Sequence, residues 1–311
     1  MVEVLRAGVI GAGVFGGYHA QKYAALPGVT LVGVYDHHAV HAEALAAKVG
    51  GQVFGSEAEL IAAVDVVSIA TPAIAHAPAA IAALKAGKAV YVEKPLAADP
   101  EDAARIAELA ARIGVVAACG FLERAGLQAM GIFDAPERPT LREAVRVSAP
   151  SPRSLDVSVV LDVMVHDLDL ALALGEGDPA TVEADGAAVA NATLDRVDAE
   201  VAFDGGFVAR FRASRIADGP ERTLRVVYPS GEVRVDFMTH ALTNTTPFAL
   251  DPNFGEAAAA RDKLGASLAA FVAAARGERA APLATVRDGA RALDLALAVE
   301  GALVQQGLVR G

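Results

Sequence analysis

Three glycines near the start of the chain stand at fixed intervals between an apolar run and an alanine-rich run. Gly11, Gly13 and Gly16 give the spacing G-x-G-x-x-G, with Val14 and Phe15 inside it. In a turn of this kind the first glycine permits the tight bend, the second lets the backbone approach a pyrophosphate, and the third lets the helix pack against the strand. The free N–H groups at the start of the helix also attract phosphate. The spacing therefore predicts a turn that binds a dinucleotide.

An acidic residue ends the next apolar run. Asp36 follows the run 30–35 and stands 20 positions after Gly16, where a carboxylate meets the ribose hydroxyls of a bound dinucleotide. His37 and His38 come next, with no arginine or lysine beside them to hold a 2′-phosphate, and a carboxylate repels that group. The pattern therefore favours NAD over NADP as the cofactor.

Further polar residues follow two later apolar runs, and ligands of an open α/β sheet bind at the carboxyl ends of its strands. The residues expected to line the cofactor cleft in this way are Thr71, Pro72, His76, Glu93 and Lys94. Lys94 is the most informative, because Pro95 fixes the backbone after it and one ammonium in the cleft can hold a hydroxyl oxygen or share its proton. A surface lysine paired with Glu93 is the alternative.

A carboxylate and an imidazole stand one helical turn apart in the later run LDVMVHDLDLALAL. Asp162, His166 and Asp169 have the spacing i, i+4, i+7 and share one face of the expected helix. This pair on an apolar helix suits removal of a proton from an alcohol, since histidine titrates near neutral pH. A buried structural His–Asp hydrogen bond is the alternative. A metal site is disfavoured because no further histidine or cysteine is close by, and Asp167, on another face, is expected to be solvated or at a domain seam.

These residues depend on a sheet that brings strand ends together. Up to about residue 120 apolar runs alternate with helix-compatible runs, which is the pattern of an α/β, doubly wound parallel sheet. The expected strands are 4–10, 30–35, 52–54, 65–70, 89–92 and 115–119. We therefore expect an N-terminal Rossmann domain over residues 1–120 that binds the dinucleotide.

The periodicity changes in the second part of the chain, residues 121–311. A strong helix is expected over 159–174, and later runs alternate with a period near two, which predicts an α+β domain with a largely antiparallel sheet of five or six strands. The expected strands are 141–148, 181–188, 193–203, 206–213, 222–228 and 232–237. The run 242–255 reads as a loop, and two helices, 264–276 and 286–306, close the chain and can pack back on the first domain.

Composition excludes several classes of partner. The formal charge of −11, the absence of Trp and the 5% aromatic content argue against a nucleic acid or an anionic membrane surface. The apolar run 66–84 contains Pro72, His76 and Pro78, so it does not favour a membrane span. Cys119 is the one cysteine, which excludes an intrachain disulfide, and a cytoplasmic location is the default expectation.

The combination of these motifs resembles the Gfo/Idh/MocA oxidoreductase family over essentially the whole chain. The shared elements are the glycine turn, Asp36, Thr71-Pro72, Glu93-Lys94-Pro95 and Asp162-x-x-x-His166. The resemblance implies oxidation or reduction of a sugar or cyclitol hydroxyl with NAD(P). It also implies a catalytic trio of Lys94, Asp162 and His166, in which His166 is the acid/base and the other two orient the hydroxyl.

A narrower likeness points to the UDP-N-acetylglucosamine 3-dehydrogenase branch of that family. It lies in the run 156–174, in Ala213-Ser-Arg215 and in Phe121-Leu-Glu-Arg124. It implies a nucleotide sugar oxidised at C3, with an anionic sugar phosphate bound by three candidate arginines, Arg124, Arg153 and Arg215. Two departures weaken a direct transfer: the branch has His in place of Phe121, and Phe-Asn-Pro in place of Ala125-Gly-Leu127.

Two other functions stay open at this point. One is an inositol or free-aldose dehydrogenase, and the other is a non-catalytic sensor that keeps the dinucleotide-binding fold. Members of the family commonly pair through the C-terminal sheet, so a homodimer or homotetramer is expected. Val201, Phe203, Val208 and Phe211 are the expected apolar contact face.

Overall fold

The computed structural model describes residues 4–151 and 157–305. The chain divides into two compact units: the first is Met1–Ala125 with Arg261–Ala290, and the second is Gly126–Ala260 with Arg291–Gly311. Residues 261–290, late in the sequence, therefore belong to the first unit. A single boundary near residue 120 does not separate the two units.

The first unit is built on a six-stranded, wholly parallel sheet in the order β3-β2-β1-β4-β5-β6. Its strands are β1 (Leu5–Ile10), β2 (Val29–Tyr35), β3 (Gln52–Val53), β4 (Val66–Ile69), β5 (Ala89–Val92) and β6 (Ala117–Cys119). Every expected strand is present, and the predicted doubly wound parallel sheet is confirmed. The order reverses between β1 and β4, so the loops after these strands flank the point where such folds bind ligands.

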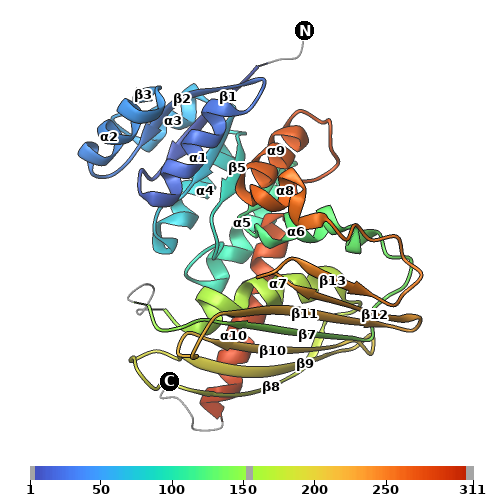
Figure 1. The fold of residues 1–311 in the computed structure, drawn as a ribbon. Helices are drawn as coiled ribbons and strands as arrows, with labels where there is room; N and C mark the ends of the chain where they lie inside the picture. Colours follow the sequence, from blue (N-terminus) through green and yellow to red (C-terminus); the bar gives the residue numbers. More distant parts are fainter. Residues whose placement is uncertain (1–3, 152–156, 306–311) are drawn as a thin grey trace. The chain divides into compact units, whose positions relative to one another are not determined.

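Helices cover the two faces of this sheet (Figure 1). They are α1 (Val14–Ala25), α2 (Ala39–Val49), α3 (Glu57–Ala63), α4 (His76–Lys85), α5 (Pro100–Ile113) and α9 (Lys263–Ala275), with a 3-10 turn at Ala73–Ala75. Tyr23 of α1 and Leu268 and Phe271 of α9 are fully buried in one core cluster with Val34 of β2. Apolar packing of α1 on β2 thus fixes the helix that follows the glycine turn.

The second unit contains a seven-stranded sheet in the order β13-β12-β11-β7-β10-β9-β8. Its strands are β7 (Leu141–Val147), β8 (Pro179–Ala187), β9 (Arg196–Phe203), β10 (Val208–Ser214), β11 (Glu221–Tyr228), β12 (Gly231–Asp236) and β13 (Ala241–Asn244). All neighbours are antiparallel except β7 and β10, which are parallel. The expected count of five or six strands was too low, because β13 lies in a run predicted as loop. It is a short edge strand whose side chains are all exposed or half-buried, so it has little apolar alternation to detect.

The second unit also contains helical segments, several of which pack on one face of its sheet. They are α7 (Val165–Leu174), preceded by a π-helical turn (Val160–Met164), α10 (Val286–Gln305), α6 (Glu123–Met130), α8 (Ala258–Arg261) and 3-10 turns at Ile132–Asp134 and Phe254–Glu256. Leu170 and Leu174 of α7 share a core cluster with Leu224 and Val226 of β11. The expected helix 159–174 is therefore present, but its first turn is wider than an α-helix, with the Val165 N–H bonded to the Val160 carbonyl.

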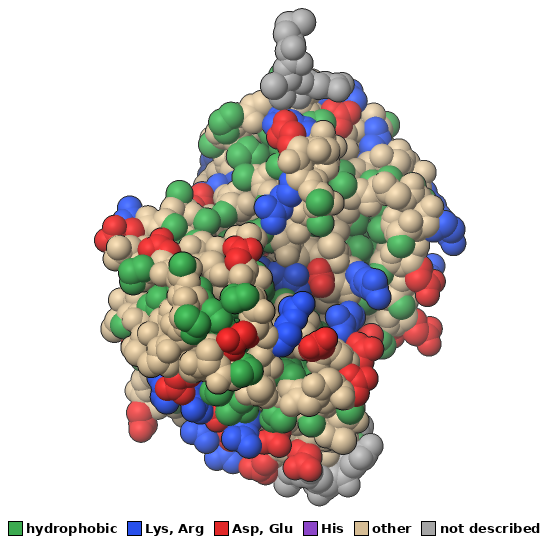
Figure 2. Space-filling model, turned by 90° about the vertical axis from the view of Figure 1, so that its right-hand side faces the viewer, with side chains coloured by type: hydrophobic (Ala, Val, Ile, Leu, Met, Phe, Trp, Pro, Cys, Tyr) green, Lys and Arg blue, Asp and Glu red, His purple; other side chains and the backbone are tan. Residues whose placement is uncertain are grey.

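Charged side chains of both signs are interspersed over the face shown in Figure 2. Within the described ranges, no helix is both long and apolar enough to cross a membrane.

Candidate active site

The glycine turn between β1 and α1 leaves backbone groups exposed where a ligand can approach. A Cβ on Gly13 would meet no atom within 4 Å, whereas a Cβ on Gly16 would lie 1.8 Å from the Gly11 carbonyl oxygen. Gly11 itself has φ of +96°. Gly11 and Gly16 are therefore needed by the fold, and the open side of the turn lies over Gly13.

The start of α1 is open as well. Gly13 is its N-cap, the first turn carries no acidic residue, and no side chain in the described part of the chain caps it. Val14 and Phe15 are 71% and 50% exposed, which leaves large apolar side chains at the mouth of the turn. Free N–H groups and the partial positive charge of the helix end suit an anion here.

The Asp36 carboxylate is held beside this turn by backbone donors. Its Oδ2 accepts from the Ala12 N–H at 2.7 Å and its Oδ1 from the His38 N–H at 2.8 Å. Burial acts to raise the pKa of Asp36, but these two N–H groups and the nearby imidazoles of His41 and His38 outweigh it, so the pKa is lowered. An ionised carboxylate with both oxygens fixed can still accept hydrogen bonds from ribose hydroxyls.

A buried histidine joins the loops that follow β4 and β5. His76 is 1% exposed, and its ring nitrogens lie 2.8 Å from the Thr71 carbonyl oxygen and 2.9 Å from the Pro95 carbonyl oxygen. The Lys94–Pro95 peptide bond is cis. The structure thus brings together Thr71, Pro72, His76, Lys94 and Pro95 at one edge of the sheet.

A buried hydrogen-bond chain lies beneath this edge. The Tyr23 hydroxyl is 2.8 Å from Ser68 Oγ, which is 2.9 Å from His19 Nδ1, and His19 Nε2 is 2.8 Å from Glu93 Oε1. The Lys94 N–H donates to the other oxygen of Glu93 at 3.3 Å. Burial raises the pKa of the Tyr23 hydroxyl, so it stays protonated and can donate toward Ser68. Sequence reasoning missed Ser68, whose small polar side chain in a buried strand was the available signal.

Asp162 and His166 lie in the second unit, on the π turn and on the first turn of α7. Both are half-buried. Asp169, expected on the same face, is 1% exposed, and its negative charge acts on Arg142 of β7. Asp169 therefore interacts electrostatically with Arg142 of the second sheet.

The expectation that Asp167 is solvated or at a domain seam was wrong. Asp167 is 6% exposed and accepts from Arg142 Nη2 at 2.9 Å and from Arg146 Nε at 2.8 Å. Burial acts to raise the pKa of Asp167, but the two guanidinium groups outweigh it and lower the pKa. This cluster, Asp167 with Arg142 and Arg146, therefore links α7 to β7.

Two of the candidate substrate arginines are built into internal networks. Arg124 donates to the Leu283 carbonyl at 3.0 Å and lies 3.3 Å from Asp288. Arg215 donates to Asp195 at 2.9 Å and to the Val157 carbonyl at 2.7 Å, and it is 6% exposed. Arg153, the third, lies outside the described residues.

The departures from the branch pattern are also internal. Phe121, Ala125 and Leu127 are each at most 1% exposed, and Leu127 belongs to the core cluster beside α7. Within each unit these side chains are packed as core residues.

The expected apolar contact face of the second sheet was wrong. Val201, Phe203 and Phe211 are at most 4% exposed, because they point to the face that the helices cover. Val208 is half-buried and belongs to the opposite face. It stands three positions before Phe211 on β10, and side chains alternate between the two faces along a strand. Val201, Phe203 and Phe211 do share one face, but Val208 was assigned to the wrong face, and alternation alone does not tell which side of a sheet is covered.

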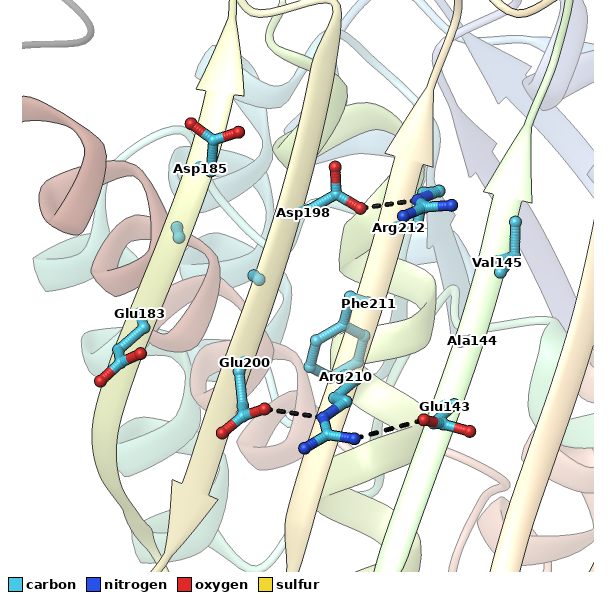
Figure 3. Close-up of a pocket in the computed structure, with 12 residues that line it drawn as sticks. Glu143, Ala144, Val145, Glu183, Asp185, Asp198, Glu200, Arg210, Phe211 and Arg212 are labelled. Carbon is cyan, nitrogen blue, oxygen red and sulfur yellow. Dashed lines mark hydrogen bonds and ion pairs between the residues drawn. The ribbon is translucent and has the colours of Figure 1, made fainter.

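The uncovered face of this sheet is charged (Figure 3). Arg210 donates to Glu200 at 2.7 Å and lies 3.5 Å from Glu143, and Arg212 donates to Asp198 at 2.7 Å. We call this surface the outer face. It borders a hollow of about 760 Å³ lined by side chains of β7, β8, β9 and β10.

Two protein-family models match the chain. The model described as an oxidoreductase family with an NAD-binding Rossmann fold matches residues 5–121. The model described as a GFO/IDH/MocA C-terminal domain matches residues 142–234.

Known proteins are similar over most of the length. UDP-N-acetylglucosamine 3-dehydrogenase of Acidithiobacillus ferrooxidans is 37% identical over 239 residues, which is 76% of each chain. A solved structure of that enzyme superposes with a TM-score of 0.87 at 34% identity, covering 97% of this chain and 98% of the other. An inositol 2-dehydrogenase of Rubrobacter xylanophilus is 32% identical over 188 residues, covering 54% of this chain and 52% of the other.

Proposed function

This chain belongs to the Gfo/Idh/MocA oxidoreductase family, and from that premise we propose that it oxidises the C3 hydroxyl of a UDP-N-acetylhexosamine with NAD. The family consists of NAD(P)-dependent dehydrogenases that act on CH–OH groups. The observation that carries the choice of substrate is the similarity to the UDP-N-acetylglucosamine enzyme over 97% of this chain.

The residues of the first unit fit NAD. The open space over Gly13 admits a pyrophosphate, and Asp36 offers acceptors to the adenosine ribose. Thr71 Oγ1 is buried, and no group among the described residues hydrogen-bonds to it, so a cofactor amide or hydroxyl would satisfy it. The absence of arginine and lysine next to Asp36 favours NAD over NADP at neutral pH.

We propose the following division of labour for the reacting hydroxyl. NAD supplies the hydride acceptor when bound. The Lys94 ammonium donates a hydrogen bond to the hydroxyl oxygen and stabilises the negative charge that develops there. His166 takes the hydroxyl proton, and Asp162, one turn earlier, orients the alcohol with Lys94.

Support for Lys94 comes from the rigidity of its surroundings. Its backbone is held on one side by Glu93 and on the other by Pro95, whose carbonyl contacts His76. A lysine on such a fixed backbone has fewer positions to sample than one on a free loop. Of the three arginines, Arg153 is the one we retain as a ligand for the sugar phosphate, because Arg124 and Arg215 use donors in internal bonds.

The test is NADH formation on adding UDP-N-acetylglucosamine to the protein with NAD, followed by absorbance. Identification of a 3-keto sugar in the product supports the proposal, and turnover of free sugars with none of the UDP-sugar contradicts it. UDP alone should compete with the substrate and raise the unfolding temperature. A protein indifferent to UDP would exclude a nucleotide sugar.

The similarity to an inositol 2-dehydrogenase favours one second candidate, oxidation of inositol or a free aldose. That match covers about half of each chain, so it carries less weight for the residues of the second unit. A panel of inositols and aldoses in the same assay decides between the two.

We also propose that the outer face meets a second copy of this chain. Its arginines on β10 stand beside acidic side chains on β9 and β7, so the face carries both signs in adjacent columns and can complement itself about a two-fold axis. Sedimentation should show a homodimer or homotetramer that the double variant R210E/R212E weakens. A wild-type monomer at micromolar concentration would contradict this.

A further inference from the structure

We propose that Arg215 and Ser158 are positioning residues of the reaction, which fix the backbone that leads into the turn carrying Asp162 and His166. The inference rests on the proposed function in one respect, that these last two side chains act on the reacting hydroxyl. It also gives a role to Arg215, which the sequence predicted as a ligand for the sugar phosphate.

The turn that carries Asp162 is built on Ser158. The Asp162 N–H donates to the Ser158 carbonyl at 3.0 Å, and the Leu161 N–H donates to Ser158 Oγ at 3.2 Å. Both bonds start the helical turn at Ser158, so the position of this residue sets that of the turn. The π turn runs from residue 160 to residue 164, and His166 comes two residues after its end.

Arg215, directly after β10, fixes the residue before Ser158. Its Nη1 donates to the Val157 carbonyl at 2.7 Å and its Nη2 to Thr193 Oγ1 at 2.5 Å. The Thr193 hydroxyl donates to the same Val157 carbonyl at 3.3 Å. The planar guanidinium therefore ties the end of β10 to the backbone of residue 157 through donors in a fixed geometry.

The guanidinium is itself held by a buried carboxylate. Asp195 is fully buried, and its Oδ2 accepts from the N–H groups of residues 189–191 at 2.7–3.0 Å. Its Oδ1 accepts from Arg215 Nε at 2.9 Å and from Asn191 Nδ2 at 2.6 Å. An arginine supported in this way has little freedom to leave the Val157 carbonyl.

Ser158 and Val159 are bound by two other segments. The Ser158 hydroxyl donates to Glu300 Oε1 of α10, and the Val159 N–H donates to the Leu194 carbonyl at 2.9 Å. Residues 157, 158 and 159 thus each bond to a different part of the second unit. We call residues 157–159 with Arg215 and Glu300 the clamp.

The other end of the turn is fixed as well. Asp167, which directly follows His166, pairs with Arg142 and Arg146 of β7. The π turn therefore lies between two anchors, and π turns are rare and are frequently found at functional sites. Because Asp162 and His166 lie between these anchors, loosening the clamp should move both side chains while the core beneath α7 stays intact.

The first experiment is steady-state kinetics of the intact protein with NAD and UDP-N-acetylglucosamine. Arg215→Lys keeps the charge beside Asp195, but one ammonium cannot replace three nitrogens that lie apart, and Ser158→Ala removes the contact to Glu300. We expect each change to lower kcat about ten-fold and to alter KM less than about two-fold, because the acid/base is displaced whereas the groups that bind ligands are not. Ser158→Thr keeps a hydroxyl and should recover most of the loss.

Arg234→Lys is the matched control. Arg234 is also an arginine of the second unit, but it is exposed and pairs with Glu232 on the surface. The same exchange there should leave kcat and KM unchanged. Thermal unfolding shows that each variant is folded at the assay temperature.

A second readout does not need turnover. The proton–carbon NMR signal of the His166 Cε1–H group, assigned with His166→Asn, reports the surroundings of that ring. It should move in Arg215→Lys and in Ser158→Ala, while the signal of His240, another histidine of the second unit, stays in place.

The outcomes separate positioning from other roles. A wild-type kcat in both folded variants overturns the proposal, even if the unfolding temperature falls, because the role is then purely structural. A rise in KM alone also overturns it, since Arg215 would then be a substrate ligand. If the wild type turns over no sugar, the proposed function fails, and the His166 signal decides whether the clamp positions this ring: a shifted signal supports it and an unmoved signal overturns it.

Discussion

His19 Nε2 and Glu93 Oε1 lie 2.8 Å apart, within hydrogen-bond distance, and the histidine side chain is 0% and the glutamate side chain 10% exposed. They come from different elements, α1 and the end of β5, and Glu93 directly precedes the lysine that we propose to be catalytic. The pair therefore links the helix after the glycine turn to the loop that carries Lys94.

Replacing His19 with Ala should destabilise the protein by about 3 kcal/mol, because it leaves the buried Glu93 carboxylate without its strongest donor. His19→Gln keeps an amide donor near the Nε2 position and should recover part of the loss. Urea unfolding of the two variants measures the difference.

Ser68→Ala is the matched control, since it removes the contact to Nδ1 and spares the bond to Glu93. We expect it to cost about 1 kcal/mol. Equal losses for His19→Ala and Ser68→Ala would show that the His19–Glu93 contact contributes no more than the His19–Ser68 contact.

Gly13→Ala and Gly16→Ala separate ligand binding from folding. The Gly13 backbone, with φ of −72°, is open to alanine and a Cβ there has free space, so the fold should be unaffected while NADH binding weakens at least ten-fold. A Cβ at Gly16 would collide with the Gly11 carbonyl, so Gly16→Ala should lower the unfolding temperature. NADH titration and thermal unfolding on both variants test this, and an unchanged NADH affinity in Gly13→Ala would remove the turn from the cofactor site.

The first unit could be predicted from sequence because its strands are buried on both faces and read as continuous apolar runs, such as 66–69 and 89–92. The glycine turn was predictable from local sterics, since Gly11 needs a positive φ and Gly16 leaves no room for a Cβ. The second unit was harder. In β7 the residues Arg142 and Arg146 alternate with Glu143 and Val145, and nothing in that pattern says that the arginines point inward.

The inward arginines have a long-range cause. Asp167 stands more than 20 positions later in the chain and supplies the charge that lets both guanidinium groups be buried. The same holds for Arg215, whose partner Asp195 also accepts three backbone N–H groups of the segment 189–191. Short-range patterns report which residues share a face, whereas pairing across elements decides which face is covered.

Lys94→Ala and His166→Ala should each slow turnover of the active substrate by about 10² or more. Neither change removes a group from the glycine turn, so NADH affinity should stay close to that of the wild type. The pH profile of kcat adds a second check, because loss of His166 should flatten its rise on the acidic side. Unchanged turnover in both variants would exclude this mechanism, whatever the substrate.

Asp167→Asn removes the negative charge between two buried arginines and leaves the side-chain volume nearly unchanged. We expect it to cost about 3–5 kcal/mol, since Arg142 and Arg146 are then left without their carboxylate in the interior. The wild-type pKa of Asp167 is lowered, so its stabilising effect is complete above the unfolded value of about 3.9 and is lost as the pH falls through the folded value. The difference in unfolding free energy between wild type and variant should therefore be constant from neutral pH down to about pH 4 and shrink below it.

Asp185→Asn is the control, because Asp185 pairs with Arg196 as an exposed ion pair and should change stability little. Equal effects of the two substitutions in urea unfolding would show that the buried cluster does not hold α7 against the sheet.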